Sequence, residues 1–155
     1  MRDLKVTEVM THLVVTFRPQ DTIYDAAQRL LSNRISGAPV TAGGRLVGVV
    51  SETDLVRALA PGHWEAARVA PAEGLAVLGV PSRDAHVCTV GEVMATKVVS
   101  IGADDSVWEA ASLIDRHGVR RLPVVDDEGF VMGVLTRSDL VRAMAQVDQE
   151  PAGVG

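Results

Sequence analysis

The sequence is poor in cysteine and has no long hydrophobic run. Cys88 is the single cysteine among 155 residues, so no disulfide can form within the chain. A lone thiol is typical of reducing compartments, and we expect a cytoplasmic location. No stretch approaches the roughly 18 apolar residues that a membrane-spanning helix needs, and the first residues do not resemble a signal peptide. We therefore expect no association with a membrane.

Positive charge is scarce as well. The chain has 15 Lys and Arg against 20 Asp and Glu, which gives a formal net charge of −5. Proteins that bind nucleic acids usually present a basic face, so we expect no nucleic-acid partner. Aromatic residues make up only 3% of the chain, but 47% of the residues are hydrophobic. This composition predicts a folded α/β protein whose core consists of small and branched side chains.

The sequence shows no signature of catalysis or of metal binding. We find no glycine-rich phosphate loop, no nucleophile elbow and no spacing that makes a metal site of the four histidines. Those histidines are His12, His63, His86 and His117. No His–Asp arrangement accompanies Cys88, which favours a buried, inert thiol over a nucleophile. We expect no catalytic residue, no metal and no enzyme activity.

The sequence does contain an internal repeat, the feature to look for first because it decides the fold. The matching segments are 6–10 and 90–94, 21–27 and 105–111, and 54–58 and 139–143. The offset is 84 residues for the first two pairs (90 − 6 = 84) and 85 for the third (139 − 54 = 85). A single inserted residue thus separates two otherwise collinear copies.

The repeat predicts the domain organisation. We assign residues 1–60 to the first copy, 61–87 to a linker with a short helix, 88–146 to the second copy and 147–155 to a flexible tail. A copy of roughly 55 residues is shorter than the about 70–80 residues that make a stable core alone. We therefore expect the two copies to pack together with pseudo-twofold symmetry.

Each copy has the same predicted order of elements, β-α-β-β-α. In the first copy a capping pattern at Thr22 starts a helix whose apolar residues recur at helical spacing. Short β-branched runs predict the strands, and the pair Gly43-Gly44 predicts a hairpin turn. The predicted elements are a strand at 14–17, a helix at 23–33, strands at 38–41 and 46–51, and a helix from 51 to about 59. The fold class is α/β, or α+β in the stricter sense.

Two pairs of residues at equivalent positions draw attention within this pattern. Gly48 and Gly133 fall inside predicted strands, which indicates a bulge or a close approach of a ligand or of another backbone segment. Tyr24 and Trp108 lie near the start of a helix but off its apolar stripe. We interpret these aromatics as part of a subunit interface, or alternatively as shields of their own helix ends.

Both copies resemble the cystathionine-β-synthase (CBS) domain. The resemblance rests on V-M-x-x-x-V-V-T, D-T-x-x-x-A-A, P-V and G-R-L-V-G-V-V-S-x-x-D-L, which cover residues 5–60 and recur in similar form at 88–145. Two such copies in tandem resemble a CBS pair, or Bateman module. The resemblance implies a regulatory homodimer that binds AMP, ADP, ATP or S-adenosylmethionine in clefts between its repeats and signals to a protein target. A ligand-free scaffold is the alternative.

The resemblance places the ligand motif at a strand–helix junction of each copy. Ser51 with Asp54, and Thr136 with Asp139, match the Ser/Thr-x-x-Asp pattern of the family's nucleotide sites. A helix N-terminus favours phosphate, and a carboxylate can accept hydrogen bonds from both hydroxyls of a ribose. The same spacing is also a capping box, which stabilises a helix by about 0.5–2 kcal/mol without any ligand. Spacing does not decide between the two.

The resemblance also implies residues that contact the adenine base, although the same residues can be plain core residues of the strands. They are Thr16, Ala38 and Pro39 in the first copy, with Ser100 and Pro123 in the second. Arg120 and Arg121 differ from their counterparts Ser36 and Gly37 in the first copy. This arginine pair can bind phosphate in a bidentate manner, or it is a surface pair, or it forms salt bridges with Asp126 and Asp127.

Overall fold

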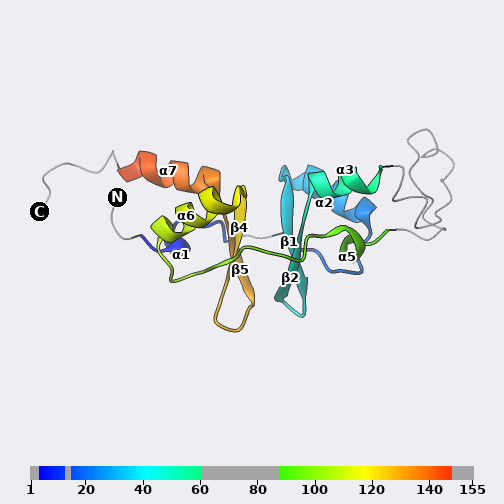
Figure 1. Cartoon of the computed structure of the whole chain (residues 1–155), viewed down its shortest axis with the longest axis horizontal. Helices are drawn as coiled ribbons and strands as arrows, with labels where there is room; N and C mark the ends of the chain where they lie inside the picture. Colours follow the sequence, from blue (N-terminus) through cyan, green and yellow to red (C-terminus); the bar gives the residue numbers. More distant parts are fainter. Residues whose placement is uncertain (1–3, 13–14, 61–87, 148–155) are drawn as a thin grey trace, which may run out of the picture. The chain divides into compact units, whose positions relative to one another are not determined.

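The computed structural model of the protein describes residues 4–12, 15–60 and 88–147, which form two compact units (Figure 1). Among the described residues, the N-repeat unit holds 15–43, 47–60 and 88–98, and the C-repeat unit holds 4–12, 44–46 and 99–147. The predicted linker helix, with His63 and His86, lies outside the described residues, as does nearly all of the predicted tail.

The N-repeat unit contains α2 (Ile23–Asn33), α3 (Glu52–Ala58), α5 (Val90–Val93) and β1 (Gly37–Ala42). It also contains β2 (Arg45–Ser51) apart from the first two residues of that strand, which pairs with β1 in a two-stranded sheet. The Thr22 hydroxyl accepts a hydrogen bond from the Asp25 N–H at 3.1 Å, as the capping pattern predicts. The helix ends at Arg34, whose φ of 56° is left-handed. The turn at Gly43 and Gly44 has φ of 60° and 86°, as the predicted hairpin requires.

The predicted first strand is wrong in its extent. Within residues 15–17 the structure shows only one isolated bridge, in which Phe17 pairs in parallel with Val40. The Phe17 N–H donates to the Pro39 carbonyl at 3.0 Å, and the Phe17 carbonyl accepts from the Thr41 N–H at 2.8 Å. Phe17 is fully buried in the core of this unit. The segment is therefore held by the packing of this ring and by one bridge, and not by a continuous strand.

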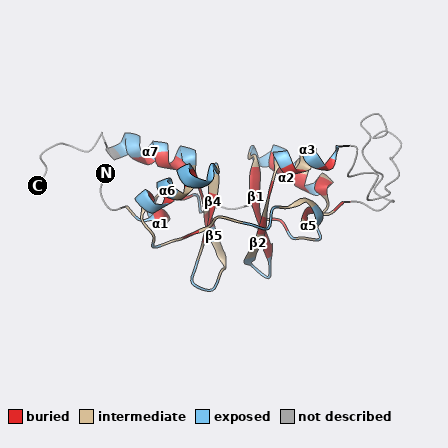
Figure 2. Ribbon diagram, in the orientation of Figure 1, coloured by how far each residue is buried: buried red, intermediate tan, exposed pale blue. Residues whose placement is uncertain are grey.

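The C-repeat unit contains α1 (Val6–Val9), α6 (Val107–His117), α7 (Arg137–Val147) and a three-stranded sheet. In this sheet β3 (Ile101–Gly102) runs parallel to β4 (Arg121–Val125), which pairs in the antiparallel sense with β5 (Val131–Thr136). The helices turn their buried faces toward the sheets and their exposed faces away from them (Figure 2). The core is aliphatic, as the composition predicts, with Leu122 and Leu135 fully buried.

The compact units do not coincide with the sequence repeats, because each unit takes its first short helix from the other copy. In the C-repeat unit the Val6 N–H donates to the Asp105 carbonyl at 2.8 Å, which ties α1 to the loop before α6. In the N-repeat unit the Val90 N–H donates to the Asp21 carbonyl at 2.7 Å, which ties α5 to the loop before α2. Figure 1 shows α1 beside α6, and α5 beside α2 and α3. Neither short helix was predicted.

The exchanged segments explain the two strand glycines, and the close approach predicted at these positions is confirmed. A methyl carbon added at Gly133 would lie 2.6 Å from the Thr11 carbonyl oxygen. At Gly48 it would lie 2.9 Å from the Ala95 carbonyl oxygen and 2.6 Å from the Met94 sulfur. Thr11 and Ala95 follow α1 and α5 and form bridges to β5 and β2. A protein segment, not a ligand, thus occupies the space beside each glycine.

Candidate functional site

The first candidate site is the junction between β2 and α3. Asp54 is 8% exposed, and its carboxylate accepts hydrogen bonds from the Ser51 N–H at 2.8 Å and from the Ser51 hydroxyl at 3.1 Å. The Ser51 hydroxyl oxygen in turn accepts from the Asp54 N–H at 3.3 Å. Arg57 lies 3.5 Å from the second carboxylate oxygen. The predicted capping box is therefore present, and the Asp54 side chain is buried in the first turn of α3.

The second candidate site is the matching junction between β5 and α7. Asp139 is 5% exposed and accepts from the Thr136 N–H at 3.0 Å, while the Thr136 hydroxyl oxygen accepts from the Asp139 N–H at 3.0 Å. The Arg142 guanidinium donates to the other carboxylate oxygen at 3.0 Å. The Thr11 hydroxyl adds a long hydrogen bond of 3.4 Å. Asp139 is thus held by the first residue of its own cap, by Arg142 and by Thr11.

The remaining candidate residues lie in or directly before the strands and bridges of their own units. Ala38, Pro39 and Pro123 are buried in their strands, and the Pro39 carbonyl is already bonded to Phe17. Thr16 and Ser100 are half-buried, and the Thr16 carbonyl accepts from the Arg29 guanidinium at 2.9 Å. The buried side chains therefore serve the core of their strands. Their role toward an adenine base stays a prediction.

The arginine pair of the second copy lies directly beside the Thr136 junction. Arg121 pairs in register with Thr136 across β4 and β5, and the Arg120 carbonyl accepts from the Arg137 N–H at 3.0 Å. Arg120 and Arg137 are exposed, whereas Arg121 is half-buried. The sequence analysis did not single out Arg137. The offset of 85 residues could have done so, because it aligns Arg137 with Glu52.

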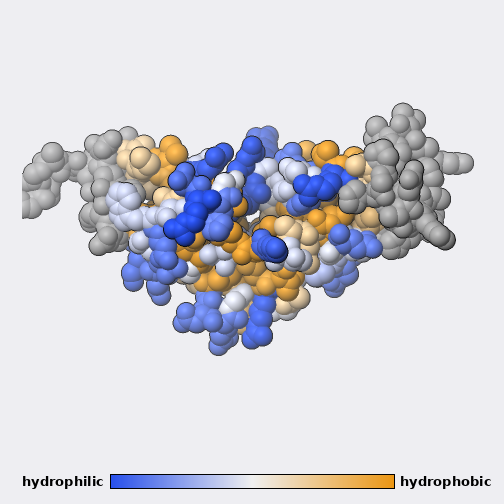
Figure 3. Space-filling view, viewed as in Figure 1, coloured by the Kyte–Doolittle hydropathy of each residue, from blue (hydrophilic) through white to orange (hydrophobic). Residues whose placement is uncertain are grey.

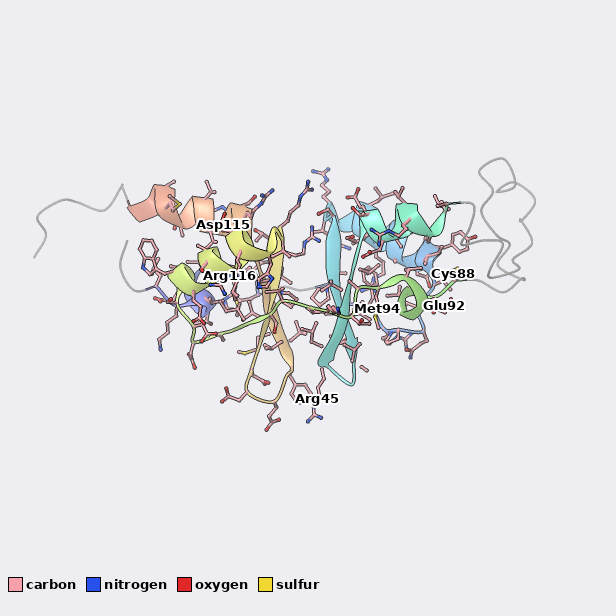
Figure 4. All side chains as sticks on the ribbon, in the orientation of Figure 1. Arg45, Cys88, Glu92, Met94, Asp115 and Arg116 are labelled. Carbon is pink, nitrogen blue, oxygen red and sulfur yellow. The ribbon has the colours of Figure 1, made fainter. Side chains whose placement is uncertain are left out.

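Cys88 is not placed to act as a nucleophile. The thiol is 6% exposed and packs in a small cluster with Ile23 and Ala58. Burial raises the pKa of the Cys88 thiol, and the negative charge of Glu92 raises this pKa further. Both residues lie at α5 (Figure 4). Because the reactive form is the thiolate, these surroundings favour the inert thiol that the sequence analysis expected.

Hydrophobic side chains are exposed on α3 and α7, the last helix of each sequence copy. Val56 and Leu59 of α3 are 66% and 42% exposed, and Val141 and Met144 of α7 are 64% and 59% exposed. The offset of 85 residues aligns the two pairs (56 + 85 = 141 and 59 + 85 = 144). Hydrophobic surface is visible over both helices in Figure 3. The same pair of apolar positions thus recurs in both copies, and we call these four residues the repeated apolar pair. The sequence analysis missed them.

The two aromatic residues proposed for an interface differ from each other in the structure. Trp108 is 53% exposed on α6. Tyr24 on α2 is half-buried. Tyr24 is thus less exposed than Trp108, and the interface role of this pair stays a prediction.

A membrane-spanning helix and a metal centre are both absent from the part of the chain that the structure describes. Within residues 4–12, 15–60 and 88–147, no helix is both long and apolar enough to span a bilayer. Over the same ranges, no group of three or more His, Cys, Asp or Glu side chains is arranged to hold a metal ion.

Comparison with known proteins assigns both halves of the chain to one family. Residues 6–61 and 90–146 each match the CBS domain. The CBS domain-containing protein YhcV of Bacillus subtilis is 32% identical over 149 residues, which cover 96% of this chain and 89% of YhcV. An uncharacterized protein of Methanocaldococcus jannaschii is 31% identical over 153 residues, which cover 90% of both chains.

A solved structure shows the same fold. The CBS-pair protein CBSX2 from Arabidopsis thaliana superposes with a TM-score of 0.74 at 28% identity, and the match covers 95% of this chain and 98% of CBSX2. The structure of CBSX2 in complex with AMP gives a TM-score of 0.72 at 28% identity, with coverages of 93% and 98%.

Proposed function

Because the chain belongs to the CBS domain family and carries two CBS domains, we propose that it is a regulatory module for an adenosine nucleotide or S-adenosylmethionine. One observation carries this proposal. A buried aspartate, Asp54 or Asp139, recurs at the strand–helix junction of each unit, in a chain 28% identical to a protein that binds AMP. Each carboxylate supplies acceptors for the two hydroxyls of a ribose.

The proposed mechanism is a shift between populations of conformers. A ligand that binds one arrangement of the chain more tightly than another raises the population of that arrangement. A partner protein that recognises this arrangement then reads the concentration of the ligand. We place this signalling in the cytoplasm, which fits a chain with a single, buried cysteine.

Thermal unfolding with AMP, ADP, ATP and S-adenosylmethionine tests the proposal. A ligand at 100 times its Kd stabilises the folded state by about 2.7 kcal/mol. For a chain of this size we expect the unfolding midpoint to rise by about 5–10 °C. GMP and GTP at equal concentration are the controls, because they carry the same ribose and phosphates on another base. The absence of a shift with every adenosyl compound would contradict the proposal.

A ligand-free scaffold is the second candidate function. It is favoured by one observation: in both junctions the Ser or Thr and the Asp already satisfy each other as helix caps. In that case the module would act only by assembling with other copies or partners.

We also propose that the chain forms a homodimer through the repeated apolar pair. Exposed apolar side chains at identical positions of both copies fit an interface that repeats with the sequence. We expect sedimentation velocity to give twice the chain mass of 16.4 kDa. The double variant Val56→Asp/Val141→Asp should be monomeric, because each subunit would then bury two unpaired charges.

The matched control is Met132→Asp, which adds a charge at another exposed apolar residue, on β5. It should leave the dimer intact. A wild-type chain that sediments as a monomer at all accessible concentrations would contradict the homodimer. Equal dissociation of the double variant and the control would contradict the assignment of its interface.

A further inference from the structure

The two junctions have the same backbone but opposite charge. In the C-repeat unit, the Arg137 N–H at the start of α7 donates to the Arg120 carbonyl at 3.0 Å. In the N-repeat unit, the Glu52 N–H at the start of α3 donates to the Ser36 carbonyl at 2.9 Å. The same hydrogen bond therefore fixes equivalent positions in both units. Only the side chains attached to this frame differ.

Three arginines gather around the second junction. Arg120 and Arg137 are joined through their backbones, and Arg121 is the cross-strand partner of Thr136. With Asp139, these residues carry a formal charge of +2 (three Arg and one Asp). We call Arg120, Arg121 and Arg137 the arginine cluster.

The first junction has no counterpart of this cluster. Ser36 and Gly37 replace the first two arginines, and Glu52 replaces Arg137, so that with Asp54 the formal charge is −2. Arg57 and Arg142 occupy equivalent positions beside the two aspartates and do not alter the contrast. The two candidate sites thus differ by four charges (+2 against −2) within a common geometry.

We propose that the two sites bind different classes of adenosyl ligand, which deepens the proposed function and rests on it. The site of the C-repeat unit selects ligands with several phosphates, such as ATP, through the arginine cluster. Guanidinium groups bind phosphate through paired, charge-assisted hydrogen bonds. The site of the N-repeat unit selects adenosyl ligands without phosphate, such as adenosine or S-adenosylmethionine, because Glu52 repels phosphate and attracts a positive charge.

Calorimetric titration with ATP and with S-adenosylmethionine tests this assignment in exchange variants. Arg120→Ser/Arg137→Glu gives two of the three cluster positions the residues of the first junction and leaves Arg121 in β4 unchanged. Both arginines are exposed, their bridging hydrogen bond is formed by the backbone, and glutamate is favourable in the first turn of a helix. We expect this variant to bind ATP at least tenfold more weakly and S-adenosylmethionine within about twofold of the wild type. The reverse exchange, Ser36→Arg/Glu52→Arg, should weaken S-adenosylmethionine and add an ATP site.

Lys5→Ser is the matched control, because it removes a positive charge from the same unit but at the other end of its sheet. Lys5 is exposed and forms a β-bridge with Ser106, which lies beyond the end of β3. Because β3 and β4 are parallel and Arg121 is the first residue of β4, Arg121 lies at the opposite end of the sheet. The control should bind ATP as the wild type does. If the exchange weakens both ligands equally, or neither, the selectivity is overturned while the proposed function stands. If the wild type binds neither ligand, the selectivity fails, and the proposed function fails with it when AMP and ADP do not bind either.

Discussion

Gly133→Ala will lower the free energy of unfolding by about 3 kcal/mol, the upper end of the usual cost of adding a methyl group to a packed core. The reason is that the added carbon would lie 2.6 Å from the Thr11 carbonyl oxygen, a backbone atom that the bridge between Thr11 and Val134 holds in place. Since each kcal/mol lowers the midpoint of a chain of this size by about 2–4 °C, we expect a fall of about 6–12 °C. Urea unfolding and calorimetry measure both quantities.

Two further glycine variants separate steric overlap from backbone strain. Gly118 has a φ of 64° and no atom within 4 Å of an added methyl group, so Gly118→Ala should cost only the left-handed conformation, about 1–2 kcal/mol. Gly48→Ala should fall between the two, because its nearest neighbour is the flexible Met94 side chain, which points toward β2 (Figure 4). If Gly133→Ala costs no more than Gly118→Ala, the close packing of Thr11 on β5 is wrong.

The long helices and the hairpins could be predicted because their signals are local. Thr22 and Ser106 both start helices with side-chain caps, and each helix ends in a left-handed residue. The hairpin turn at Gly43 and Gly44 could likewise be predicted, because the turn needs positive φ angles that glycine adopts without strain. Signals of this kind act over three or four residues and need no knowledge of the rest of the chain.

The exchange of the first helices could not be predicted, because it depends on long-range packing between equivalent sequences. Val6 and Val90 occupy the same position of the repeat, and both are fully buried. Either segment therefore carries the side chains that fit either unit. A four-residue helix is also too short to show an amphipathic period. Local patterns indicate what such a segment buries, but not the unit in which it is buried.

At Gly48 of β2 and Gly133 of β5, a local feature of the sequence has a long-range contact as its cause. The sequence indicated either a bulge or a close approach at Gly48 and Gly133, and a strand glycine alone does not distinguish a ligand from a protein segment. The structure shows that the exchanged segments occupy these places. Consequently the candidate sites narrow to the strand–helix junctions, where Asp54 and Asp139 lie.

Asp139→Ala distinguishes a binding residue from a plain helix cap, since it should alter both stability and ligand affinity. Removing this carboxylate leaves the Thr136 N–H without its acceptor and Arg142 without its partner. The loss of a cap costs about 0.5–2 kcal/mol, which lowers the midpoint by about 1–8 °C in the absence of ligand. If the carboxylate also accepts the two ribose hydroxyls, the Kd for ATP should rise at least tenfold.

Asp139→Asn sharpens the distinction, because the amide retains one oxygen acceptor for the Thr136 N–H but loses the charge and the second acceptor. We expect it to keep most of the stability while binding ATP nearly as weakly as Asp139→Ala. Asp126→Asn is the control within the same unit. Asp126 accepts from the Glu128 and Phe130 N–H groups at 2.9 and 3.0 Å in the β4–β5 turn, outside the Thr136–Asp139 junction. Variants of Asp139 that lose stability but bind ATP with unchanged affinity would make this carboxylate a cap alone.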